Sequence, residues 1–122
     1  MEFYEMAFNQ HQPTQAVKKY FGNKYIQHNP HVPNGALAFT KYFEEFFKQN
    51  SKAKVEMKRV LADGDLVAIH SHFKINSSDL GNAVVDIFRF EKGKIVEHWD
   101  VVQSVPEKMV NGNTMFDGMN EK

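Results

Sequence analysis

Three ionisable side chains interrupt strongly apolar segments in the second half of the chain. Asp86 lies among the valine, isoleucine and phenylalanine residues of 83–90, and His98 and Asp100 interrupt the apolar segment that follows. A carboxylate among apolar side chains costs free energy unless it is paired, protonated or turned toward a polar cavity. Together with His28, these residues are candidates for moving a proton, because His and Asp are common general acids and bases.

The two apolar segments are separated only by Glu91-Lys92-Gly93-Lys94, which is typical of a β-hairpin with a tight glycine turn. A plain two-residue turn pairs residue 86 with residue 99 and turns His98 and Asp100 to the opposite face of the sheet. A one-residue bulge reverses that parity. The residues alone allow both registers. We predict the bulged register because it gathers the three polar groups in one cavity.

Helical periodicity precedes the strands. Apolar spacing predicts a short helix over residues 1–9 and a second helix that begins at Thr14 and ends at Gly22. A third helix is predicted over residues 36–48, where Phe43 and four other apolar residues share one side and charged residues occupy the others.

From Ala53 onward the hydrophobic period changes to two residues, which is typical of β-strands. Residues 54–61 and 66–73 predict a first hairpin, before the second at 83–102. Helices followed by four antiparallel strands indicate an α+β domain with three N-terminal helices packed on a strongly curved antiparallel sheet. We expect one domain over residues 1–105 and an irregular tail over residues 106–122.

Composition excludes several partners. Among the 122 residues, 15 are Lys or Arg and 15 are Asp or Glu, so the formal net charge is zero and no basic field attracts nucleic acid or an anionic membrane. No signal-peptide pattern and no segment of membrane-spanning length is seen, so we expect a cytoplasmic protein. Eleven Phe, four Tyr and one Trp predict either a dense core or a pocket for a flat apolar ligand.

The six histidines raise the question of a metal. The candidate ligands lie on separate predicted elements and form no short ligand motif, so we expect no metal site, and no organic cofactor is indicated. His70 and His72 share one face of a strand, and we expect them to point toward solvent or a partner subunit.

Two motifs resemble the SnoaL-like polyketide cyclase family of the nuclear transport factor 2-like superfamily. These are Tyr-Ile-Gln-His-Asn-Pro-His at 25–31 and Asp-Ile-Phe-Arg-Phe-Glu-Lys-Gly-Lys-Ile-Val-Glu-His-Trp-Asp at 86–100. The resemblance covers about residues 1–105. It implies a cone-shaped fold shared with ketosteroid isomerase, scytalone dehydratase and the limonene epoxide hydrolases, although a shared fold does not transfer chemistry.

The resemblance to ketosteroid isomerase implies that Tyr4 and Asp86 correspond to its oxyanion-stabilising tyrosine and aspartic acid. The general-base aspartate of the isomerase precedes a proline, whereas this chain has Asn29 before Pro30. Asparagine takes up no proton at neutral pH. An enolate mechanism of the kind the family uses therefore requires Asp86 or Asp100 as the acid and base.

We therefore expect a small-molecule enzyme that acts on an apolar carbonyl compound through an enolate-type intermediate, by aldol cyclisation, isomerisation or related acid/base chemistry. The proton-transfer candidates are Asp86, His98, Asp100 and His28. The residues expected to contact the ligand are Tyr4, Asn29, Phe43, Phe88, Trp99 and Val102. The alternative is a non-catalytic domain that binds a hydrophobic ligand or forms a dimer.

Apolar residues occupy both faces of the predicted strands, as Val84 and Val85 or Val101 and Val102 illustrate. A sheet covered by helices on one side leaves this second apolar face to water or to a partner. We expect a homodimer through that face. The competing expectation is that the tail after Pro106 folds back over the sheet.

Overall fold

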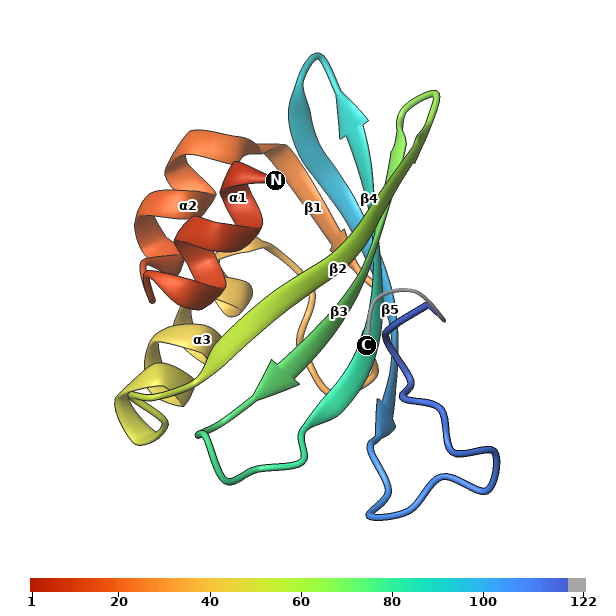
Figure 1. Cartoon of the computed structure of the whole chain (residues 1–122). Coiled ribbons are helices and arrows are strands. Elements are labelled where there is room, and N and C mark those ends of the chain that lie inside the picture. The colour runs from red at the N-terminus through yellow and green to blue at the C-terminus, as the bar shows by residue number, and fades with distance from the viewer. Residues whose placement is uncertain (119–122) are drawn as a thin grey trace.

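The computed structural model describes residues 1–118, in which the elements follow the order α1, η1, α2, β1, α3, β2, β3, β4 and β5 (Figure 1). The helical segments are α1 (Glu2–Tyr4), which continues directly into the π-helical turn η1 (Glu5–Asn9), then α2 (Pro13–Tyr20) and α3 (Ala36–Gln49). The strands are β1 (Phe21–Gln27), β2 (Lys54–Asp63), β3 (Leu66–Lys74), β4 (Asn82–Glu91) and β5 (Lys94–Ser104). Among these helices, none has the length and apolar character needed to span a membrane.

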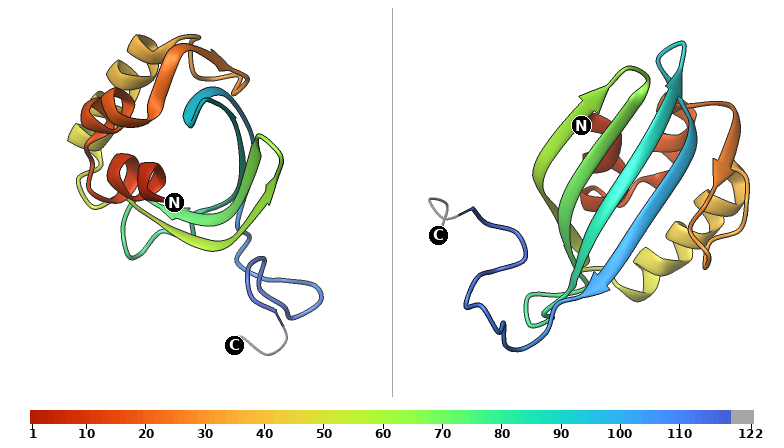
Figure 2. Two further views of the ribbon diagram at one scale, coloured as in Figure 1. Left: turned by 90° about the horizontal axis from the view of Figure 1, so that it is seen from above. Right: turned by 90° about the vertical axis from the view of Figure 1, so that its right-hand side faces the viewer.

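The five strands form one sheet in the order β1-β5-β4-β3-β2. Strands β2 to β5 pair antiparallel with their neighbours along the chain, and β1 pairs in parallel with β5. Figure 2 shows the sheet strongly curved, with the helices facing its concave side. The predicted α+β class, the three N-terminal helices and the curved sheet are confirmed. The sheet is mixed rather than purely antiparallel, because β1 joins it at the edge and runs parallel to β5.

The helix predicted over residues 36–48 is confirmed as α3. The prediction that Gly22 ends the second helix is wrong: α2 ends at Tyr20, and Gly22 belongs to β1. A Cβ atom on Gly22 would lie 3.0 Å from Val96 Cγ1. Gly22 is therefore explained by the close approach of β1 to β5 rather than by a helix end.

The turn between β4 and β5 sets the register of the site. Lys92 and Gly93 both have positive φ angles, 52° and 79°, as in a type I′ hairpin turn. Beyond the turn the register shifts between Arg89 and Phe90, so that Asp86 pairs with Asp100. The predicted one-residue bulge is confirmed. It directs side chains 86, 98 and 100 to the same face.

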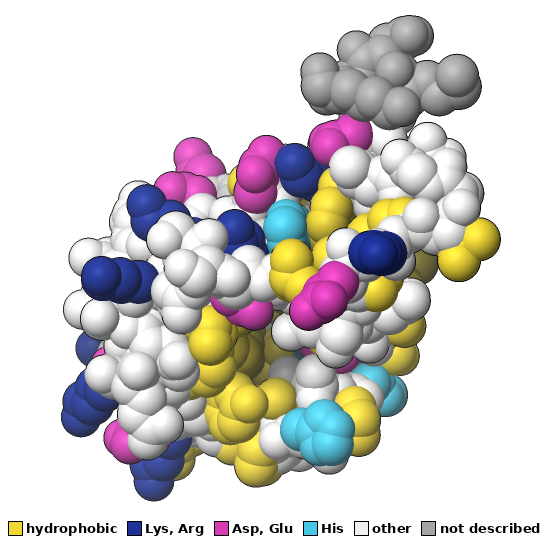
Figure 3. All heavy atoms as spheres, turned by 60° about the horizontal axis from the view of Figure 1, so that its bottom comes forward, with side chains coloured by type: hydrophobic (Ala, Val, Ile, Leu, Met, Phe, Trp, Pro, Cys, Tyr) yellow, Lys and Arg dark blue, Asp and Glu magenta, His cyan; other side chains and the backbone are white. Residues whose placement is uncertain are grey.

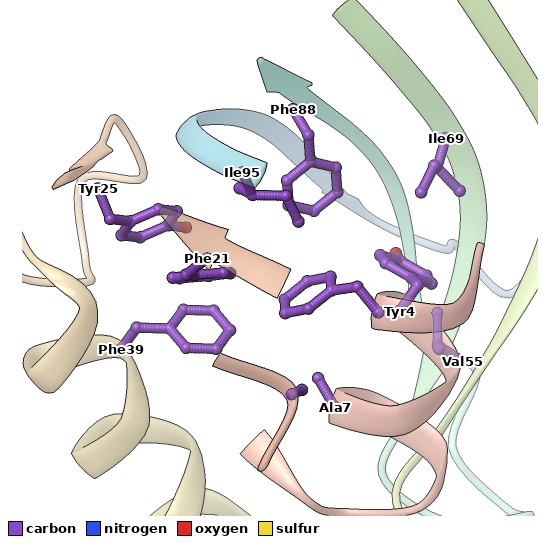
Figure 4. Close-up of a cluster of buried hydrophobic side chains, with 11 residues drawn as sticks. Tyr4, Ala7, Phe21, Tyr25, Phe39, Val55, Ile69, Phe88 and Ile95 are labelled. Atoms are coloured by element: carbon purple, nitrogen blue, oxygen red, sulfur yellow. The ribbon is translucent and has the colours of Figure 1, made fainter. Parts of the chain in front are cut away.

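An aromatic core joins the first helix to the sheet (Figure 4). The Phe3 ring is fully buried, and its centroid lies 5.2 Å from the ring of Phe21, 5.6 Å from Phe88 and 6.1 Å from Phe39. Tilted and edge-on aromatic pairs add stability beyond their buried area. This packing holds the neighbouring residue Tyr4 against the concave face of the sheet.

The described part of the tail, residues 105–118, contains no helix or strand and contacts the outer face of the sheet. The buried Phe116 ring stacks on His72 with a centroid distance of 4.2 Å, and Arg59 donates a hydrogen bond of 2.7 Å to the Phe116 carbonyl oxygen. Val85 and Val101, which pair on the same face, remain 39% and 72% exposed. The tail thus covers only part of the outer apolar surface.

Candidate active site

A cavity of about 260 Å³ lies between the helices and the concave face of the sheet. In Figure 3 a hollow is bordered by hydrophobic side chains. Aromatic rings form much of its wall: Phe8, Phe39, Tyr42, Phe43, Phe46, Phe73 and Phe88. Polar side chains from α1, β1, β4 and β5 also reach it, and several of them are hydrogen-bonded to one another. The cavity therefore combines apolar walls with a compact polar cluster.

The centre of this cluster is a buried row of hydrogen-bonded side chains from four elements. Tyr4 Oη donates to Asp86 Oδ2 over 2.6 Å and lies 2.7 Å from Ser71 Oγ. On the other side of the carboxylate, Asp86 Oδ1 lies 2.7 Å from His98 Nε2. Both oxygens of Asp86 are thus engaged, which explains how this carboxylate is accommodated among apolar strand residues.

Asp100 faces the same cavity from β5, directly opposite Asp86. Its Oδ2 lies 3.8 Å from His98 Nε2, and the amide of Asn29 donates to both carboxylate oxygens, over 2.9 and 2.8 Å. Burial raises the pKa of Asp100, and the nearby charge of Asp86 adds to that effect. A carboxylate with a raised pKa is a stronger base than a solvent-exposed one, as proton abstraction requires.

Two tyrosines of the site are held in the protonated form. Burial is the main reason that the pKa of Tyr4 lies well above its usual value, and the charge of Asp86 raises it further. Burial likewise raises the pKa of Tyr25, whose hydroxyl accepts a hydrogen bond from Gln27 Nε2 over 3.0 Å. Both phenols therefore remain protonated at neutral pH.

Most of the predicted site residues meet at the cavity. Those that line it are Tyr4, Asn29, Phe43, Asp86, Phe88, His98, Asp100 and Val102. His28 and Trp99 are not part of its lining, in contrast to their predicted role. Their rings stack at 4.9 Å, and His28 Nε2 lies 2.7 Å from Glu97 Oε2. Trp99 lies outside because the bulged register that turns His98 and Asp100 inward turns Trp99 outward.

Sequence reasoning missed two polar residues of the cluster, Ser71 and Gln27. Ser71 is fully buried and lies two residues from Ile69 and from Phe73 in β3. Because side chains alternate between the faces of a strand, this spacing could have predicted that Ser71 faces the cavity side of the sheet. Gln27 was missed because the sequence patterns did not predict that β1 joins the sheet, so the pairing of Gln27 with His98 in β5 was not foreseen.

Asp86, His98 and Asp100 are also residue types that bind metals, and one donor atom from each lies within 4.8 Å of the others. The 2.7 Å contact between Asp86 and His98 has the length of a hydrogen bond. Two ligands about 2 Å from one cation usually stand farther apart than this. The observed spacing therefore fits a shared proton better than a metal ion between these two residues.

The fold of the chain is similar to solved structures. A candidate polyketide cyclase from Acidithiobacillus ferrooxidans is 15% identical with a TM-score of 0.71, covering 83% of this chain and 82% of that protein. A SnoaL-like protein of unknown function from Burkholderia thailandensis is 18% identical with a TM-score of 0.71, and the match covers 84% of this chain and 91% of that protein. AclR, a candidate hydroxylase from Streptomyces galilaeus, is 19% identical with a TM-score of 0.67, covering 84% of both chains.

Among curated protein sequences, none is close enough to this chain to count as a match. The family comparison is more informative, because the model of the SnoaL-like domain matches residues 1–98. These residues include α1, β1, β4 and the part of β5 that carries His98. The chain therefore belongs to the SnoaL-like domain family.

Proposed function

We propose that the cavity binds a small apolar carbonyl compound and that the polar cluster catalyses its reaction through an enolate. The observation that carries this proposal is the position of Asp100, a largely buried carboxylate whose Oδ2 lies 3.8 Å from His98 Nε2 and so beside the buried row of Tyr4, Asp86 and His98. Asp100 accepts a proton, and the row of Tyr4, Asp86 and His98 can donate one. Enolate chemistry needs both next to the same substrate.

In the first step, Asp100 removes the proton from the carbon next to the carbonyl group. The electron pair of the broken C–H bond moves to the carbonyl oxygen, and the Tyr4–Asp86–His98 row stabilises the negative charge by hydrogen bonding. The proton held by Asp100 then returns to a different carbon, which gives isomerisation. In an aldol closure, the enolate carbon instead forms a bond to the carbon of a second carbonyl group, and the proton held by Asp100 passes to the alkoxide that results.

Asn29 supports the assignment of Asp100 as the base. Asn29 occupies the position at which the resemblance to ketosteroid isomerase implies a general-base aspartate, and its amide donates two hydrogen bonds to Asp100. We infer that the base has moved to Asp100 and that Asn29 orients its carboxylate. Asp86 is less suitable as the base because its Oδ1 already shares a proton with His98 and its Oδ2 accepts a hydrogen bond from Tyr4. The hydrogen bonds to Asp100 come instead from the neutral amide of Asn29.

The cavity dimensions favour a compact substrate. Its volume of about 260 Å³ compares with roughly 150 Å³ for an engineered protein cavity that binds benzene. A ligand with one or two rings would fill this space. The aromatic wall would exclude water from the enolate, which strengthens hydrogen bonds to its oxygen.

Solvent exchange tests the reaction with simple carbonyl compounds in place of the natural substrate. The protein is incubated in heavy water with a panel of cyclic ketones and β-keto esters, and NMR follows the loss of the α-proton signals. At least one compound should exchange faster than in buffer. Asp100→Asn should slow the catalysed exchange by about 100-fold or more. Asp63→Asn, the same change at the exposed end of β2, is the matched control and should exchange at the wild-type rate.

The competing function is a carrier of hydrophobic ligands, which the apolar walls alone would also suit. A compound that binds the cavity with no catalysed exchange, and with equal affinity for the wild type and Asp100→Asn, would favour the carrier. Catalysed exchange that survives in Asp100→Asn would refute the role given to Asp100.

A further inference from the structure

The side-chain amide of Gln27 has an orientation that its neighbours determine. The backbone N–H of Asn29 points to one atom of this amide over 3.1 Å, and a backbone N–H can only donate. That atom must therefore be the carbonyl oxygen Oε1. The amide nitrogen Nε2 then faces the hydroxyl of Tyr25 over 3.0 Å, to which it donates.

The same Gln27 oxygen lies 2.7 Å from His98 Nδ1. An amide oxygen has no proton to give, so Nδ1 must supply the hydrogen of this bond. Aromatic rings also pack near the buried imidazole. Its centroid lies 4.8 Å from the centroid of the Phe88 ring and 6.5 Å from that of the Tyr25 ring, to which it is nearly parallel. A ring held in this way has little freedom to exchange the places of its two nitrogens.

The opposite nitrogen, Nε2, lies 2.7 Å from Asp86 Oδ1 and 3.8 Å from Asp100 Oδ2. A contact of 2.7 Å between a ring nitrogen and a carboxyl oxygen requires one proton between them. Either Asp86 is protonated and His98 is neutral, or Asp86 is ionised and His98 is an imidazolium. In both cases Nδ1 carries its own hydrogen, and the proton available for transfer lies in the contact between Nε2 and Asp86 Oδ1.

We propose that Gln27 is a positioning residue that fixes the tautomer of His98, so that Nδ1 always carries a hydrogen and the exchangeable proton of the site lies between Nε2 and Asp86. Without the Gln27 acceptor, a neutral His98 is free to carry its hydrogen on Nε2 and to donate it to an ionised Asp86. The site would then lose one proton while retaining a hydrogen bond of similar geometry. The catalytic consequence of this assignment rests on the proposed function, whereas the tautomer does not.

The tautomer is measured directly on the wild-type protein, with no substrate present. Two-bond ¹H–¹⁵N NMR spectra of histidine-labelled protein distinguish a protonated from an unprotonated ring nitrogen, and His98→Asn identifies the His98 signals by their loss. We expect a protonated Nδ1 with a hydrogen-bonded N–H resonance. A neutral His98 with a bare Nδ1 would overturn the proposal.

Two substitutions of similar size test whether Gln27 is the cause. Gln27→Met removes the acceptor, and the Nδ1 resonance should move to that of an unprotonated nitrogen. Gln27→Glu restores an acceptor, so Nδ1 should remain protonated. Gln49→Met, in an exposed part of α3, is the control and should leave the His98 signals unchanged. A protonated Nδ1 in folded Gln27→Met would refute the role of Gln27. If Gln27→Met does not fold, a bare Nδ1 in Gln27→Glu would refute it instead.

The exchange assay separates failure of this inference from failure of the proposed function. If the wild type catalyses α-proton exchange, Gln27→Met should lower kcat more than it changes KM, and Gln27→Glu should recover part of the loss. If no compound exchanges, the proposed function fails and the NMR result still decides the tautomer.

Discussion

The phenol oxygen of Tyr4 lies 2.6 Å from Asp86 Oδ2, although the two residues are 82 positions apart in the chain. This hydrogen bond connects the first helix to a central strand of the sheet. It also means that the most buried carboxylate of the site depends on the placement of the N-terminal residues. The site and the packing of α1 are therefore expected to be coupled energetically.

Replacing Tyr4 by Phe tests this coupling. The change removes a donor to Asp86 and leaves Ser71 without its hydroxyl partner, so we expect a loss of roughly 1–3 kcal/mol in the free energy of unfolding. Urea denaturation gives this value. Tyr20→Phe, which loses only an exposed hydrogen bond to Glu2, should change stability by less than about 0.5 kcal/mol. Equal effects of the two substitutions would contradict the coupling.

Alkaline pH should destabilise the protein through its buried phenols. Burial raises the pKa of Tyr4 and Tyr25, so above about pH 10 the native state holds protons that the unfolded chain has released. The free energy of unfolding should therefore fall as the pH rises beyond that value. Denaturation curves at several alkaline pH values measure the slope. Tyr25→Phe should show a shallower fall than wild type, and Tyr20→Phe should match wild type.

Asp100→Asn is expected to gain stability at neutral pH. Because burial raises the pKa of Asp100, the native state binds its proton more tightly than the unfolded chain does. The stability that this proton confers is complete below about pH 4 and is lost as the pH rises through the raised pKa. At pH 7 the variant should be more stable than wild type by roughly 0.5–2 kcal/mol.

Denaturation at two pH values checks the Asp100 prediction. The gain should shrink as the pH falls through the raised pKa of Asp100, because the wild-type carboxyl then takes up its proton in the native state. Asp63→Asn should show neither the gain nor the pH dependence. A variant less stable than wild type at neutral pH would mean that the carboxylate contributes more through Asn29 than its burial costs.

We propose that two copies of the chain associate through the outer face of the sheet, where Val85 and Val101 are exposed. Light scattering at tens of micromolar should give a dimer for the full chain. A chain ending at Pro106 should also dimerise, because the tail covers a different part of this face, around His70 and His72.

A charge placed on this face should break the dimer. Val101→Glu is expected to be monomeric, whereas Val110→Glu, at a fully exposed tail position, should behave as wild type. A monomeric wild-type chain would rule the interface out, and a dimer that persists in Val101→Glu would place it elsewhere.

The sequence contained most of what was needed to predict the sheet and the polar cluster. Period-two patterning located strands β2 to β5. The residues alone left the register open, and the bulged register was predicted because it gathers Asp86, His98 and Asp100 in one cavity. That register then brought His98 and Asp100 to the Asp86 face. The strands and the register of the β4–β5 hairpin depend on residues that are close together in the chain. Local sequence patterns can therefore predict them.

The predictions that failed concern contacts between distant segments. Gly22 has the composition of a helix end, yet its role is the close approach of β1 to β5, which is visible only once the strands are paired. His28 and Trp99 were assigned to the pocket, yet their rings stack on each other outside its lining. Trp99 faces outward because of the predicted bulge itself, whereas the place of His28 depends on the pairing of β1 with β5. Parallel pairing between segments far apart leaves little trace in either one.

The bulge between β4 and β5 has a consequence for how this family can change over evolution. The same residues paired without the bulge would place Trp99 opposite Asp86 and carry His98 and Asp100 to the outer face. Composition, length and hydropathy would be identical in the two registers. Two family members can thus retain every polar side chain of the site and still differ in whether the strand register brings those side chains together.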